Sequence, residues 1–269
     1  MGTKVNRAIE IYADEGLSEV AKRTKSWLAM KSRPWVRRPR MELQKVHLRA
    51  KYGTAAPAPL KIITVDSDRV TQMLRPNFYD RGKPRYGTFV VGGEWDKQLV
   101  ANSGRPGLKP FKEYCLCQST IEHFKDGVDW EETSGYYQEK IDYHGSGWYS
   151  SVEDIYESIR ERGYRRQRNL DSGMEESYKK YFVPPEYDEI RVNISRDGEV
   201  IFDDGRHRFA ALSVMDIDEI PVRVFVRHRK WQELRGEIAN ASAKSQLSDR
   251  ARRFLDHPDM EDVNDHLKS

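Results

Sequence analysis

Alternation between hydrophobic and polar positions is clearest at residues 220–228, "IPVRVFVRH". Ile220, Val222, Val224 and Val226 recur at every second position, and this period of two predicts a β-strand, here an edge-like one. Two further strands are predicted at 188–195 and 199–202. The intervening "RDG" (196–198) favours a tight hairpin, because Asp-Gly accepts the positive φ that such turns need.

Helical periodicity flanks these strands. At 151–167 an apolar stripe with helical spacing predicts an amphipathic helix. We expect Ser151, together with Asp154, to cap the start of this helix, and we expect Gly163 to end it. A short helix is expected at 206–215. From Lys230 onward the chain is predicted to be helical and polar, and to fray after about Ser245.

The N-terminal half has a different character. Residues 3–32 are predicted to be helical, 32–40 form a basic break with two prolines, and 52–60 is a linker of small residues and prolines. A strand is predicted at 60–70, with Asp66 and Asp68 at a turn or helix cap. No long periodicity marks 71–150, where aromatic residues, glycine and charge predict short elements with ordered loops. These patterns divide the chain into a basic helical arm (1–52), a main domain (60–229) with an insertion at 71–150, and a helical polar tail (230–269).

Composition limits where the protein resides. The chain has 269 residues, of which 38% are hydrophobic, and its apolar runs are too short to span a bilayer. Acidic residues occupy the N-terminal stretch where a signal peptide needs an apolar core. The two cysteines, Cys115 and Cys117, argue against a disulfide scaffold. We therefore expect a cytoplasmic protein without a transmembrane segment.

Charge is distributed unevenly along the chain. The first 60 residues hold 13 Lys or Arg against five acids, a net charge of +8, whereas the whole chain has +3. Attraction to a polyanion should therefore be concentrated in this arm. Three alternatives stay open for residues 17–51: a solvated helix face, a weak nucleic-acid contact, or an anionic-membrane contact through the amphipathic helix 17–30, which would make the protein peripheral to a membrane.

The junction in "VIFDDGRHRFAALSVM" (200–215) carries the main chemical signal. Arg206, His207 and Arg208 fall where a helix begins, although the positive end of a helix dipole repels cations. An anion placed among these side chains and the unpaired amides of the first helical turn would reverse that balance. The pattern therefore predicts a phosphate-binding site, for which a nucleotide is the expected ligand. The alternative is that Asp203 and Asp204 cap the helix and pair with the arginines.

These stretches resemble a known superfamily. "YESIRERGYRRQ" (156–167) resembles the first conserved box of ParB-like domains, and "IFDDGRHRFAAL" (201–212) resembles the second box and the Gly-Cys-His-Arg loop of sulfiredoxin. "IPVRVFV" is similar to the strand that closes that fold. The resemblance implies an α+β domain with a small mixed ParB/sulfiredoxin-like sheet and helices, to which this chain adds an N-terminal helical arm and an aromatic-rich insertion.

The resemblance also implies residue roles. Gly205, His207 and Arg208 match the loop that holds a nucleoside triphosphate in ParB and ATP in sulfiredoxin. Arg206 stands where sulfiredoxin has its nucleophilic cysteine, so sulfiredoxin chemistry is not expected. Two basic residues follow the first box, where the family often adds phosphate contacts. These are Arg165 and Arg166.

Small-molecule kinases that act on free serine belong to the same superfamily and use an acid as the base. Four acids could serve as base or Mg²⁺ ligand here: Asp66, Asp68, Asp203 and Asp204. We take Asp203 and Asp204, with His207, as candidate catalytic residues, and the two acids as candidate Mg²⁺ ligands.

The expected function is nucleotide binding, with ATP or CTP and Mg²⁺, and phosphotransfer to a small polar acceptor selected by the insertion. Whether the protein is an enzyme stays open. A DNA-associated ParB-like regulator or nuclease and a non-catalytic nucleotide-gated adaptor are the alternatives. About 40 residues follow Arg229, too few for a helix-turn-helix and a dimerisation domain, so a partition role is not expected.

Two other groups of residues could carry chemistry. Cys115, Cys117 and His123 could offer metal ligands, but Cys-x-Cys is unusual for zinc and buried thiols are expected instead. Acids flank Trp95 and Trp130, and we expect them either to be solvated or to face a polar, sugar-like acceptor. These acids are Glu94, Asp96, Glu131 and Glu132.

Overall fold

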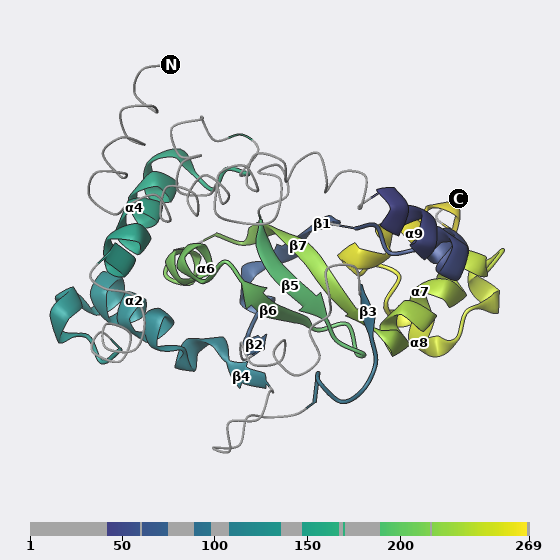
Figure 1. Cartoon of the computed structure of the whole chain (residues 1–269), viewed down its shortest axis with the longest axis horizontal. Helices are drawn as coiled ribbons and strands as arrows, with labels where there is room; N and C mark the ends of the chain where they lie inside the picture. The colour runs from purple at the N-terminus through teal and green to yellow at the C-terminus, as the bar shows by residue number, and fades with distance from the viewer. Residues whose placement is uncertain are drawn as a thin grey trace, which may run out of the picture. The chain divides into compact units, whose positions relative to one another are not determined.

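The computed structural model describes residues 42–59, 61–74, 89–97, 108–135, 147–166, 169, 189–215 and 217–267 (Figure 1). The predicted helix at 3–32 and the basic break at 32–40 lie outside the described residues, as does most of the basic arm. The chain divides into two units, residues 1–47 and 48–269. The described part of the first unit, 42–47, is helical, and helical structure extends to residue 52. The fold that follows is that of the second unit.

A mixed seven-stranded sheet is formed by the described residues, in the order β1-β7-β5-β6-β2-β4, with β3 pairing with β7. β5 lies parallel to β7 and antiparallel to β6, and β1 is antiparallel to β7. The α+β class is therefore confirmed. The strands are β1 (Ile62–Asp66), β2 (Gln72–Leu74), β3 (Val90–Val91), β4 (Leu108–Pro110), β5 (Ile190–Ile194), β6 (Val200–Asp204) and β7 (Glu219–His228).

The predicted hairpin at 196–198 is confirmed, since β5 and β6 pair in antiparallel register around it. Gly198 has φ +82°, and a Cβ added there would come within 2.8 Å of the Trp231 ring. The Ser195 hydroxyl accepts hydrogen bonds from the backbone N–H groups of Asp197 and Glu199. Glycine is thus required both by the backbone conformation and by the close approach of an indole.

The strand predicted at 220–228 exists as β7, but it is not at an edge. It hydrogen-bonds to β1 on one side and to β5 on the other. Its alternate positions are also buried, because Arg223 is 3% exposed and Arg227 is fully buried. The edge-like interpretation was wrong because those charged side chains point into packed layers rather than into solvent.

Besides the helical residues 42–52, six α-helices accompany the sheet in the described residues. They are α2 (Cys115–Asp126), α4 (Gly147–Arg162), α6 (Arg206–Leu212), α7 (Arg229–Asn240), α8 (Asp249–Arg253) and α9 (Glu261–Asn264). Seven 3₁₀ turns join them: η1 (Gly53–Ala55), η2 (Ser67–Arg69), η4 (Phe111–Glu113), η5 (Trp130–Glu132), η10 (Lys244–Gln246), η11 (Pro258–Met260) and η12 (Asp265–Leu267). None of the described helices is long and apolar enough to cross a membrane.

Helix boundaries test the predicted caps. α4 begins at Gly147, so the predicted N-cap at Ser151 is wrong and that residue lies inside the helix. Its end is as predicted: Gly163 has φ +68° and donates its N–H to the Ile159 carbonyl at 2.8 Å. At the end of β1, the predicted cap is confirmed, because the Asp66 carboxylate accepts from the Asp68 N–H and starts η2.

Aromatic rings connect the sheet to α6. Phe202 of β6 stacks on Phe209 of α6 with centroids 5.2 Å apart, and Phe111 meets both rings edge-on. Ala210 and Ala211 are fully buried, and these small side chains allow α2 and α4 to pack closely on α6. Figure 1 shows α2, α4 and α6 grouped together, with α7, α8 and α9 gathered at the other end of the sheet.

Residues 246–267, the described part of the C-terminal tail, do not fray. Leu247, Met260, Val263 and Leu267 are at most 5% exposed and belong to the main core cluster. Asp259 is fully buried in the same region. The frayed-tail prediction was therefore wrong, because the polar composition of this segment concealed a set of buried apolar and ion-paired side chains.

Candidate functional site

The turn between β6 and α6 is made by Gly205. It adopts the left-handed conformation, with φ +96° and ψ +31°, as the N-cap of α6. A Cβ at this position would lie 3.2 Å from the Ile190 Cα on β5. Any other residue would be strained and would press on the neighbouring strand. The sharp strand-to-helix turn that the motif requires is therefore present.

Arg206 is tied to the insertion. Its Nη1 donates a hydrogen bond to the Tyr114 hydroxyl at 2.9 Å. Tyr114 immediately precedes α2, and its half-buried ring packs against Phe111. No local pattern predicts this contact, because Tyr114 lies in a region without long periodicity and far along the chain from Arg206.

Arg208 connects the second motif to the first. Its side chain is 7% exposed and hydrogen-bonds to the Tyr164 hydroxyl, two residues beyond the end of α4. The same hydroxyl donates to Glu189 Oε2 at 2.9 Å. Burial raises the pKa of Tyr164 well above its usual value, and Arg208 opposes this shift while Glu189 adds to it. The phenol therefore stays neutral and can donate.

The two acids before Gly205 differ in their surroundings. The Asp203 side chain is fully buried and binds Arg191 Nε and Asn193 Nδ2 of β5. Asp204 keeps 56% of its side chain exposed, accepts from the Gly205 N–H at 2.9 Å, and lies 3.4 Å from Arg191 Nη2. Arg191 thus joins both carboxylates, a partner that the sequence pattern did not suggest.

The remaining predicted residues adjoin this cluster. His207 is half-buried in the first turn of α6. Arg165 and Arg166, also half-buried, follow Tyr164 directly in the chain. The structure therefore brings the end of the first motif to the second motif through Tyr164 and Arg208.

The acids of the insertion have structural partners. Asp96 is 3% exposed and accepts from the Arg196 backbone N–H, Nε and Nη2, at 2.6–3.0 Å. Burial alone would raise the pKa of Asp96, but these hydrogen bonds lower it. Glu94 lies 3.1 Å from Arg196 Nη1, whereas Glu131 and Glu132 are exposed on η5. Asp96 and Glu94 thus attach the insertion to the β5–β6 hairpin.

The cysteines and His123 do not converge. Cys117 is buried with its Sγ 3.6 Å from Ser213 Oγ, and burial raises the pKa of its thiol. His123 stacks on Trp130 with centroids 4.1 Å apart. Within the described ranges, no group of three His, Cys, Asp or Glu side chains is placed to hold a metal ion. The prediction of a buried thiol is confirmed for Cys117.

Comparisons with known proteins identify no protein similar to this chain. No protein-family model matches the chain, and no curated protein or solved structure is significantly similar to it. The geometry around Gly205 and α6, together with the motifs in the sequence, therefore carries the functional argument.

Proposed function

We propose that the protein is a ParB/sulfiredoxin-like nucleotide-binding protein, with the triphosphate of ATP or CTP held at the turn from Gly205 to Arg208. The two motifs that suggested this, residues 156–167 and 201–212, are separated by 33 residues of sequence. A shared site requires that the two motifs meet in space. The hydrogen bond between Tyr164 and Arg208 at the start of α6 supports such a site.

The contact of Tyr164 with Arg208 is the observation that carries the proposal. A buried tyrosine at the end of the first motif hydrogen-bonds to a nearly buried arginine of the second motif. Burying a guanidinium is unfavourable unless its N–H groups are hydrogen-bonded. Here the burial orients the side chain beside the first turn of α6, which is the place where a phosphate would be bound.

The supply of positive charge supports an anionic ligand. Arg206 and Arg208 begin α6, and Arg165 and Arg166 follow Tyr164. Forked guanidinium groups bind phosphate oxygens in pairs, and Gly205 supplies the left-handed turn that starts α6 beside them. We therefore assign these four arginines to phosphate binding, with His207 as an additional donor.

Phosphotransfer to a small polar acceptor is the activity that we propose for this site. Mg²⁺ would supply charge neutralisation of the transferred phosphoryl group. Asp204 fits the metal because its carboxylate is half exposed, and Mg²⁺ is commonly held by one or two carboxylates plus substrate phosphates. Asp203 fits less well, because Arg191 and Asn193 engage its carboxylate, so we assign it to positioning Arg191.

Calorimetry with ATP and CTP tests nucleotide binding. We expect binding of at least one nucleotide to the wild type, and a loss of about tenfold in affinity for Arg206→Gln. Arg160→Gln is the matched control, because Arg160 is an exposed arginine on α4 that pairs with Glu157. Absence of binding at millimolar concentrations, or equal losses in both variants, would contradict the proposal.

A non-catalytic nucleotide-gated adaptor is the second candidate, and the ion-paired state of Asp203 favours it. A general base must contact the acceptor hydroxyl, and the Asp203 carboxylate is fully buried and bound by Arg191 and Asn193. Incubation with ATP·Mg and a panel of polar metabolites distinguishes the two candidates. Phosphorylated product that is lost in Asp204→Asn indicates the enzyme, and binding without turnover indicates the adaptor.

A further inference from the structure

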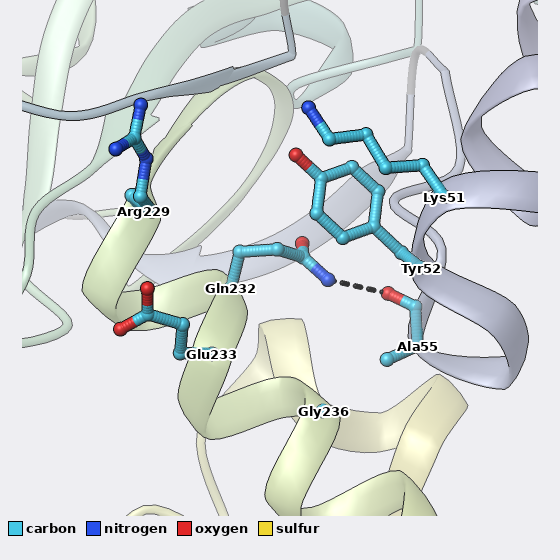
Figure 2. A pocket seen from close by; sticks show the side chains of 7 residues that line it. All are labelled: Lys51, Tyr52, Ala55, Arg229, Gln232, Glu233 and Gly236. Carbon is cyan, nitrogen blue, oxygen red and sulfur yellow. Dashed lines mark hydrogen bonds between the residues drawn. The ribbon is translucent and has the colours of Figure 1, made fainter.

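A recess separate from the Gly205–α6 turn lies between residues 51–55 and the first turns of α7 (Figure 2). Its volume is about 390 Å³, which is within the range of small-molecule sites. None of its lining residues belongs to α6 or to the loop before it.

A buried amide forms the floor of this recess. Gln232 is 3% exposed, and its Nε2 donates to the Ala55 carbonyl at 2.7 Å, which fixes the orientation of the amide. Its Oε1 has no hydrogen-bond partner among the described residues. Figure 2 shows this oxygen on the side of the amide toward Tyr52. Because buried polar atoms are nearly always hydrogen-bonded, Oε1 calls for a donor from a ligand.

Two cations contribute to the recess. Lys51 and Arg229 line it, and neither pairs with a carboxylate within the described part of the chain. In Figure 2 both head groups lie toward the same end of the view. The Arg229 guanidinium lies against Gly92, where an added Cβ would be 3.2 Å from its Cζ. Lys51 Nζ is 5.2 Å from the centre of the Tyr52 ring. This end of the recess therefore suits an anion.

The other lining groups suit a hydroxylated molecule. Glu233 is exposed and has no ion-pair partner among the described residues, so its carboxylate is available to accept hydrogen bonds from hydroxyl groups. The half-buried Tyr52 ring offers an aromatic face and a hydroxyl. At Gly236 an added Cβ would meet nothing within 4 Å, so the wall there is open.

We propose that this recess binds a small phosphate ester that carries hydroxyl groups. The phosphate lies between Lys51 and Arg229, a hydroxyl donates to Gln232 Oε1, and Glu233 accepts from another. Inorganic phosphate supplies the charge but fills little of the volume, and a neutral sugar supplies the hydroxyl groups without the charge. The two halves of the recess thus select for a molecule that has both. This site does not depend on the nucleotide site at α6.

Calorimetry with glucose 6-phosphate, inorganic phosphate and glucose tests the ligand class on the full chain. We expect glucose 6-phosphate to bind about tenfold or more tightly than either of the other two probes. If it binds no more tightly than inorganic phosphate, or not at all at about 10 mM, the proposal is overturned.

Variants then locate the binding. Gly236→Leu places a side chain in the open space of the recess without changing charge, and the double variant Lys51→Gln/Arg229→Gln removes both cations. Each should weaken glucose 6-phosphate binding about tenfold or more, with thermal unfolding confirming that the fold is retained. The control Lys230→Gln, at an exposed lysine of α7 outside the recess, should bind normally.

Arg206→Gln separates this site from the nucleotide site. Glucose 6-phosphate should bind this variant with unchanged affinity, even where ATP or CTP binding is lost. Binding that survives Gly236→Leu and is lost in Arg206→Gln would assign the ligand to α6 and would overturn the proposal for the recess.

Discussion

Arg227 of β7 and Asp259 of η11 form an ion pair in which both side chains are fully buried. Nη2 of the arginine lies 2.6 Å from one carboxylate oxygen, and Nε lies 2.8 Å from the other. The Trp231 indole N–H donates to the same carboxylate at 3.0 Å. Arg235 also contacts Asp259, and this arginine is fully buried as well. Asp259 thus compensates Arg227, and it shares the compensation of Arg235 with Asp262, whose carboxylate lies 2.9 Å from Arg235 Nη2.

Replacement of Asp259 by asparagine should be strongly destabilising. Removing one partner of a buried ion pair costs about 3–5 kcal/mol, because the other charge stays buried without compensation. Urea unfolding followed by circular dichroism would measure the loss in the free energy of unfolding. Asp249→Asn is the matched control, since Asp249 is 92% exposed and pairs with Arg252 at the surface. Its effect should stay below about 1 kcal/mol, and similar losses in both variants would contradict the role assigned to burial.

Stability should fall in acid. Burial alone would raise the pKa of Asp259, but Arg227 and Arg235 overcome this effect and hold the pKa far below its ordinary value. Hydrogen bonds from Arg196 lower the pKa of Asp96 in the same way. A carboxyl whose pKa is depressed by folding stabilises the fold above its unfolded pKa of about 4, and that contribution is lost as the pH falls further.

Urea titrations between pH 7 and pH 3 check this dependence. The midpoint should fall steeply below about pH 4. A midpoint that rises or stays constant below pH 4 would show that these carboxylates are not paired in the folded protein.

Gly236→Ala should raise stability. The residue lies inside α7, and an added Cβ would meet nothing within 4 Å. Alanine is favoured over glycine in a helix interior by about 1 kcal/mol. Thermal unfolding should therefore show a higher midpoint, and a lower one would mean that the recess beside α7 is filled by another part of the chain.

Gly198→Ala should have the opposite effect. At φ +82° an L-residue is strained, and its Cβ would press on the Trp231 ring. We expect a loss of at least about 1 kcal/mol in the free energy of unfolding. The same measurement serves both glycine variants, and a neutral result at Gly198 would argue against the close packing of the hairpin on α7.

Gly205→Ala tests the turn before α6. With φ +96° and Ile190 Cα 3.2 Å from an added Cβ, the substitution should lower stability and displace the start of the helix. Nucleotide affinity should fall by about tenfold or more if the phosphates lie at this turn. Gly127→Ala, at a left-handed glycine that ends α2 and has open space around it, is the control for strain alone. Equal nucleotide binding in both variants would argue against the assigned site.

Local patterns predicted the elements whose determinants are adjacent in sequence. The Asp-Gly hairpin, the end of α4 at Gly163 and the alternation of β7 each depend on a few neighbouring residues. α2 was missed, because four polar residues interrupt its short apolar stripe. These are Gln118, Ser119, Thr120 and Glu122.

The candidate site could be predicted in part. The motif residues 205–208 are adjacent in sequence, whereas Tyr114, Tyr164 and Arg191 reach them through tertiary packing. The predictions of a frayed tail and of an edge-like strand failed because of buried charges. Asp259, Arg227 and Arg235 are residue types that usually lie on a solvated surface. Their pairing depends on partners 24 to 32 residues apart, which no local pattern reveals.

Synthesis of the chain proceeds from the N-terminus, and this order gives the Asp259 carboxylate a further significance. Lys61, at the start of β1, lies 3.0 Å from the Asp259 carbonyl and 3.6 Å from its carboxylate, although the two residues are 198 positions apart. The guanidinium groups of Arg227 and Arg235 are synthesised before the carboxylates of Asp259 and Asp262 that compensate them. The buried ion pairs that join β7 and α7 to η11 therefore cannot form until residue 259 has been synthesised.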